Sequence, residues 1–111
     1  MKTADWMNRI AATDRTFRRD GDRWIGKCLI CNGPLAFDAS TGVGANIEHI
    51  VPRAQGGSND LLNLGITHPH CNGEKGVHWD APRRRRANPD RYAQLIARLL
   101  AERRRRWRDP A

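Results

Sequence analysis

Four polar residues near the middle of the chain have the types and spacing of a hydrolytic metal site. Glu48 and His49 are adjacent, Asn63 follows His49 by fourteen positions, and Asn72 lies nine positions further on. An imidazole can accept a proton from water near neutral pH, and carboxylate and amide oxygens are hard donors suited to Mg²⁺ or Mn²⁺. Each residue alone fits an ordinary strand, turn or helix-cap position, but the combination favours metal-assisted hydrolysis.

A frame of soft metal donors surrounds these residues. Cys28 and Cys31 form a Cys-x-x-Cys pair, and His68 and Cys71 form a second pair at the same spacing. Four such donors suit one tetrahedral Zn²⁺ in a closed, structural site, whereas the alternative is cysteines buried as small hydrophobic residues. His70 is a second candidate for the fourth ligand. The spacing favours His68, because adjacent residues such as His70 and Cys71 rarely point at one ion.

The cysteine count also bears on the compartment. The chain has three cysteines, an odd number that argues against a disulfide framework. It has no stretch resembling a signal peptide and no long apolar run. We therefore expect a cytoplasmic, reducing location and no association with a membrane.

The segments that carry these residues predict a hairpin followed by a helix. Residues 47–51 and 64–67 are short runs rich in β-branched residues and predict two strands, with turn composition at 55–60. Residues 70–77 predict a short helix weakened by its glycines. Zinc bound at its first turn would hold this helix against the hairpin.

The run from Cys28 to Gly76 resembles the HNH endonuclease family, which has a ββα-metal (His-Me finger) fold. The resemblance covers rather less than half of the chain, and order, spacing and residue type all agree. Among the members of this family, the chain resembles the small stand-alone ones of the kind encoded by phages or mobile elements. The matching pieces are Cys28-x-x-Cys31, Glu48-His49-Ile50-Val51-Pro52-Arg53, Gly56-Gly57, Asn63-Leu64 and Cys71-Asn72-x-x-Lys75.

The resemblance implies a role for each central residue. His49 is expected to be the general base, Glu48 and Asn72 to hold one catalytic Mg²⁺ or Mn²⁺, and Asn63 to brace the loop that orients His49. Two positions depart from the common pattern, because Asn72 stands where histidine is usual and His68 where a zinc-binding cysteine is usual. Asparagine also occurs at the former position in the family, so activity is still expected.

The positive charge of the chain lies at its C-terminal end. The formal net charge is +8, and residues 81–111 hold eleven arginines against three acidic residues. Asn88, Pro89 and Asp90 are typical of a helix start, and an apolar stripe follows from Tyr92 to Leu100. We expect the stripe to pack on the core and the arginines to face solvent or phosphate.

These patterns give one domain of the α+β class: an N-terminal helix within residues 1–22, a zinc-stabilised ββα-metal core at 23–80 and an arginine-rich C-terminal helix at 81–111. The N-terminal helix is expected to begin after Thr3 and to reach about Phe17. The expected partner is DNA, held mainly by its backbone. The predicted DNA contacts are Arg53, Lys75, Arg83, Arg84, Arg85, Arg86, Arg103 and Arg104.

Two functions from different classes fit this organisation. The first is a DNA endonuclease acting as a monomer or weak dimer, and the second is a zinc-stabilised nucleic-acid-binding module without cleavage activity. The presence of Glu48, His49, Asn63 and Asn72 together favours the endonuclease, because binding alone does not require all four residues.

Overall fold

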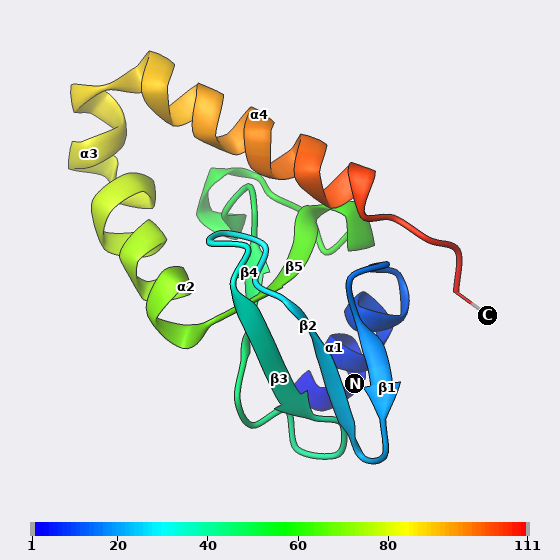
Figure 1. The fold of residues 1–111 in the computed structure, drawn as a ribbon. Coiled ribbons are helices and arrows are strands. Elements are labelled where there is room, and N and C mark those ends of the chain that lie inside the picture. The colour runs from blue at the N-terminus through cyan, green and yellow to red at the C-terminus, as the bar shows by residue number, and fades with distance from the viewer. Residues whose placement is uncertain (1, 111) are drawn as a thin grey trace.

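The computed structural model describes residues 2–110, which form two small antiparallel sheets surrounded by helices (Figure 1). One sheet has the strand order β1-β2-β3, and the other pairs β4 with β5. The strands are β1 (Arg18–Asp20), β2 (Arg23–Lys27), β3 (Pro34–Asp38), β4 (Asn46–His49) and β5 (Leu64–Thr67). The α-helices are α1 (Thr3–Ala12), α2 (Pro69–Lys75), α3 (Pro82–Ala87) and α4 (Pro89–Arg105). Short helical turns are η1 (Arg53–Gln55), η2 (Leu61–Asn63) and the π-helical η3 (Gly76–Asp80).

The β4–β5 hairpin followed by α2 confirms the predicted ββα-metal core and the α+β class. Strand β5 has the predicted bounds, whereas β4 ends at His49, two residues before the predicted end. The cause is the side-chain amide of Asn63, which accepts a hydrogen bond from the backbone N–H of Val51 and donates one to the carbonyl oxygen of Val51. One more backbone hydrogen bond follows β4, from Ile50 N–H to the carbonyl oxygen of Asn63, and the Asn63 side chain then replaces the strand ladder at Val51.

The N-terminal helix is shorter than predicted, because α1 ends at Ala12 and does not reach Phe17. Asp14 ends it, since its Oδ1 accepts hydrogen bonds from the backbone N–H and the hydroxyl of Thr16 at 2.8 and 2.7 Å. The chain then enters β1, which the sequence analysis missed. Gly21, with φ +62°, makes the tight turn from β1 to β2.

The core lies between α1, the three-stranded sheet and the β4–β5 hairpin. Met7 and Ile10 of α1 pack in one cluster with Phe17, Phe37 and Ile66. A smaller cluster joins Leu29, Ile50 and Leu99, so the apolar stripe of α4 packs against the metal-binding module, as expected. No helix among the described residues is long and apolar enough to cross a membrane.

The end of α4 differs most from expectation. Arg103 and Arg106 were predicted to face solvent or phosphate, but both have 0 % exposed surface. Arg103 donates to the carbonyl oxygens of Leu64 and Thr13 at 2.7 and 3.0 Å and to the Thr13 hydroxyl. The prediction that Arg103 contacts nucleic acid is therefore wrong. The guanidinium can be buried because these backbone and hydroxyl oxygens accept its hydrogen bonds.

Arg106 and Arg108 complete a set that we call the arginine clamp, together with Arg103. Arg106 donates to the carbonyl oxygens of Lys27 and Cys28 and to the side chain of Asn32, and it lies 3.7 Å from the carboxylate of Asp14. Arg108 donates to the carbonyl oxygens of Ala11, Ala12 and Phe17. The clamp therefore caps the end of α1 and braces the Cys28–Cys31 turn.

Candidate active site

The two Cys/His pairs come together beside the β2–β3 hairpin. One ligand atom from each of Cys28, Cys31, His68 and Cys71 lies within 4.8 Å of the others. The Nδ1 of His68 is 3.3 Å from the sulfur of Cys31, and its Nε2 is 2.9 Å from the carbonyl oxygen of Pro34. Because a carbonyl only accepts, Nε2 carries the proton and Nδ1 offers a free lone pair. This donor set fits a tetrahedral zinc ion.

His70 is the less suitable fourth ligand. Its ring stacks on that of His68 with centroids 5.2 Å apart, and its Nε2 is 3.5 Å from the sulfur of Cys71. It is not part of the four-residue cluster, however, whereas His68 is. The structure therefore brings together the ligand set that the spacing favoured.

The thiols are poised to exchange protons for a metal. The backbone N–H of Gly33, 3.3 Å from the sulfur, lowers the pKa of Cys31 to about 7. Burial, followed by the nearby thiol of Cys28, raises the pKa of Cys71 to about 12. Sulfur atoms packed this closely cannot all ionise without a cation, so metal binding would release protons.

Three of the four predicted site residues line one shallow depression between β4 and α2, and the fourth, Asn63, lies outside it. Glu48, His49 and Asn72 contribute to its wall, and its volume is about 330 Å³. Arg53 and Asp80 line the same depression. The hairpin and α2 therefore bring a candidate base and two oxygen donors to one surface, with the guanidinium of Arg53 at its rim.

His49 is held by a residue that the sequence analysis missed. Its Nε2 lies 2.9 Å from the side-chain oxygen of Asn59. With Nε2–H donating to this oxygen, Nδ1 is the nitrogen available to accept a proton. Asn59 lies in a turn of Gly, Ser, Asn and Asp, where an asparagine is ordinary, so nothing in the sequence marked it.

Asn63 holds the loop that carries Asn59. Its Oδ1 accepts from the backbone N–H of Val51 at 2.8 Å, and its Nδ2 donates to the carbonyl oxygens of Ser58 and Val51 at 2.9 and 3.1 Å. Ser58 directly precedes Asn59. These hydrogen bonds join both ends of the loop after β4, as the proposed bracing role requires.

Lys75 is not an exposed phosphate contact, and that prediction is wrong. The side chain is buried, and its ammonium group lies 2.8 Å from Glu48 Oε1 and 2.8 Å from Asp80 Oδ2. It also donates to the carbonyl oxygen of Ile50 at 3.1 Å. The helical position of Lys75 points it inward, where two carboxylates compensate its charge.

Glu48 and Asn72 keep donor capacity for an ion. Burial raises the pKa of Glu48, and the hydrogen bond from Lys75 opposes this shift. The Nδ2 of Asn72 donates to the carbonyl oxygen of Ile47 at 3.0 Å, which leaves the amide oxygen as a metal donor. A carboxylate and an amide oxygen fit Mg²⁺ or Mn²⁺, and the small number of protein ligands leaves room for water and phosphate.

The other predicted DNA contacts lie on the surface. Arg53, Arg83, Arg84, Arg86 and Arg104 are exposed. Arg85 is half-buried and donates through Nε to the carbonyl oxygen of Asp80 at 2.9 Å. Four of the five exposed arginines therefore lie beside the depression or on α3, and Arg104 lies on the last turns of α4.

Comparison with known proteins supports this reading of the site. Residues 28–78 match the family model described as HNH endonuclease, a span that holds both Cys/His pairs and every predicted catalytic residue. The search of curated proteins and the search of solved structures gave no match. Residues 28–78 of this chain therefore belong to the HNH endonuclease family.

Proposed function

We propose that this protein is an endonuclease that hydrolyses phosphodiester bonds of DNA with one divalent ion. The observation that carries the proposal is the shared depression, in which an oriented imidazole lies beside a carboxylate and an amide. His49 acts as general base, Glu48 and Asn72 hold the ion, and Asn63 maintains the loop. The zinc cluster is structural, because four protein ligands leave no open position.

The chemistry follows from the available atoms. When bound, Mg²⁺ or Mn²⁺ supplies a Lewis acid that stabilises charge on the phosphate and on the leaving oxygen. Nδ1 of His49 takes the proton from the attacking water, while Asn59 holds Nε2 and so fixes the ring. The exposed Arg53 at the rim is the candidate contact to a phosphate oxygen.

DNA is expected to bind along the elbow between α3 and α4. Arg83, Arg84, Arg86 and Arg91 are exposed there, and none of them forms an ion pair within the described part of the chain. Arg84 and Arg91 also line a pocket of about 270 Å³ with Trp79, whose ring offers an apolar face to a sugar or base. Turn η3 supplies Trp79 to this pocket and Asp80 to the depression, so one DNA strand can follow η3 between them.

The second candidate function is a zinc-stabilised DNA-binding module without cleavage. One observation favours it, because the Lys75 ammonium already occupies Oε1 of Glu48 and reduces the negative charge available to an ion. The first function is preferred because a binding module has no use for the hydrogen bond that orients His49.

Plasmid cleavage at low salt distinguishes the two functions. Purified wild type and His49→Ala are each incubated with supercoiled DNA in Mg²⁺, Mn²⁺ or EDTA. The proposal predicts that wild type alone, and only with added metal, relaxes or linearises the plasmid. Intact plasmid in every metal, together with a shift on a native gel, would support the binding module.

A further inference from the structure

The segment that follows the family domain contributes to the depression. Asp80 and Tyr92 lie outside residues 28–78, yet both belong to the hydrogen-bond network of Lys75 and Glu48. We propose that Asp80, held by Tyr92, is a positioning residue of the metal site, which acts through Lys75 to keep Glu48 oriented and available to a divalent ion. This inference rests on the proposed function, because it assigns the ion to Glu48.

The geometry places Lys75 between the two carboxylates. Its ammonium lies 2.8 Å from Glu48 Oε1, and 3.0 and 2.8 Å from the two oxygens of Asp80. It also lies 3.1 and 3.5 Å from the carbonyl oxygens of Ile50 and His49. One side chain therefore touches the candidate metal ligand and the backbone of the candidate base. A displaced Lys75 would disturb both groups.

The charges of this cluster explain why a second carboxylate is needed. Lys75 and the Glu48 carboxylate alone form a neutral buried pair, which would attract a divalent cation weakly. With Asp80 the three groups carry one net negative charge, so Lys75 can be neutralised by Asp80 while Glu48 binds the ion. Asp80 thus removes an electrostatic barrier that the family domain alone would present.

The C-terminal segment fixes Asp80 in this position. The Tyr92 hydroxyl donates to Asp80 Oδ1 at 2.7 Å and accepts from Gln55 Nε2 at 3.0 Å. Burial raises the pKa of Tyr92 to about 12, so the hydroxyl keeps its proton at working pH. The guanidinium of Arg85 donates to the backbone carbonyl of Asp80, and the π-helical turn η3 ends at this residue. Helix α4 therefore holds the carboxylate of Asp80, and α3 holds the backbone of the same residue.

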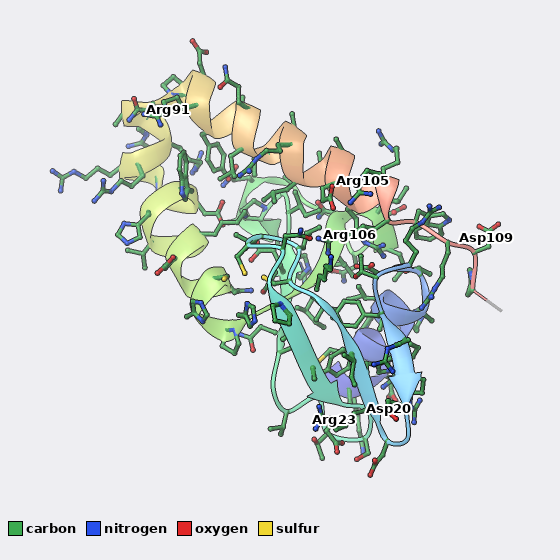
Figure 2. The ribbon with its side chains drawn as sticks, viewed as in Figure 1. Asp20, Arg23, Arg91, Arg105, Arg106 and Asp109 are labelled. Carbon is green, nitrogen blue, oxygen red and sulfur yellow. The ribbon has the colours of Figure 1, made fainter. Side chains whose placement is uncertain are left out.

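The test is Mn²⁺ binding to the zinc-loaded full chain without DNA, measured by electron paramagnetic resonance. Asp80→Asn is expected to weaken Mn²⁺ affinity by about tenfold, because a lost residue that orients a metal ligand has an effect of this size. Tyr92→Phe is expected to weaken the affinity by less. Asp20→Asn is the matched control, because it removes the same charge from an exposed position on the distant β1–β2 hairpin (Figure 2). Zinc content and circular dichroism report whether each variant is folded.

A double variant tests the route through Lys75. If Asp80 acts through Lys75, Asp80→Asn should have little further effect on Mn²⁺ affinity in a Lys75→Met background. An Asp80→Asn variant that binds Mn²⁺ as tightly as Asp20→Asn would overturn the inference, as would a wild type that binds no Mn²⁺. A wild type that binds Mn²⁺ but leaves plasmid intact would overturn the proposed endonuclease function, while the Mn²⁺ affinities would still judge the role of Asp80.

Discussion

The two ends of the C-terminal segment are equally rich in arginine but use it in opposite ways. At the α3–α4 elbow, Arg83, Arg84, Arg86 and Arg91 are exposed and lack ion pairs within the described residues. At the other end of α4, the arginine clamp is directed into the protein. Figure 2 shows this separation, with Arg91 at one end of α4 and Arg105 and Arg106 at the other.

The difference comes from the partners that each end meets. The clamp faces the carbonyls at the end of α1, the backbone of Lys27 and Cys28, and the buried carboxylate of Asp14. The planar guanidinium can bond several of these oxygens at once, which compensates for its burial. The four exposed arginines of the elbow form no ion pair with the described residues, and Arg85 donates there to the carbonyl oxygen of Asp80. Composition alone therefore assigns a charge to a segment but does not say whether its partner is DNA or the protein itself.

Removal of zinc should cause the largest loss of stability, and the loss should include the region around the arginine clamp. Arg106 bonds the carbonyl of Cys28, a zinc ligand, so loss of the metal is expected to free the clamp's binding site as well as the Cys/His cluster. We predict that chelation and dialysis unfold the centre of the protein. An unchanged melting curve by circular dichroism, with zinc content shown to be zero, would contradict this.

Arg106→Ala should cause the next largest loss of stability. The substitution leaves the buried carboxylate of Asp14 and several carbonyl oxygens without their partner, which costs about 3–5 kcal/mol of the free energy of unfolding. Arg103→Lys should also destabilise the protein, because an ammonium cannot reproduce the planar fork. Urea unfolding measures both, with the exposed Arg104→Ala as control. Equal stabilities of Arg106→Ala and Arg104→Ala would show that the clamp contributes nothing.

Substitutions at the elbow should weaken DNA binding while leaving the stability of the protein almost unchanged. Replacing Arg84 and Arg91 together by Gln should weaken DNA binding by roughly tenfold or more at low salt and reduce the slope of log affinity against log salt by about 2. Stability should stay within about 0.5 kcal/mol of wild type. The control is Arg23→Gln, which lies on the distant hairpin (Figure 2). DNA affinity that falls equally in this control would mean that only net charge matters.

Glu102 offers the smallest and most selective change, because it pairs with both an exposed and a buried arginine. Arg105 and then Arg106 hold the pKa of Glu102 at about 2, below its ordinary value of about 4.5. The stabilisation is therefore present above pH 4.5 and is lost as pH falls toward 2. Glu102→Gln should lower the free energy of unfolding by less than about 1 kcal/mol at neutral pH. The difference from wild type should vanish near pH 2, and a difference that persists there would contradict the assignment.

The sequence predicted the parts of this protein that depend on local spacing. The two Cys/His pairs, the β4–β5 hairpin and the start of α4 at Pro89 follow from short-range patterns, and the structure contains them. The end of α1 at Ala12 and the strand β1 were missed, because a helical periodicity continued past a turn that Asp14 forms.

The remaining errors concern contacts between segments far apart in the chain. Arg103 bonds Thr13 across ninety positions, and Lys75 bonds Glu48 across twenty-seven. A charged residue is usually exposed, so only the three-dimensional arrangement reveals the acceptors that keep these two inside. Asn59 and Asp80 lie only ten and five positions from His49 and Lys75, but each is an ordinary residue type for its local position, so nothing in the sequence marked either one.

The most direct test of the account is single-turnover cleavage of a labelled DNA duplex with protein in excess. Wild type, His49→Ala and the Arg84/Arg91 double Gln variant are compared in Mg²⁺ at saturating concentration. We predict that His49→Ala binds DNA normally but cuts about 10²–10⁴-fold more slowly, which is the usual contribution of a general base. The double variant should cut at nearly the wild-type rate once the DNA is saturated with protein. A His49→Ala rate equal to that of wild type would contradict the assignment of this depression as the nuclease site.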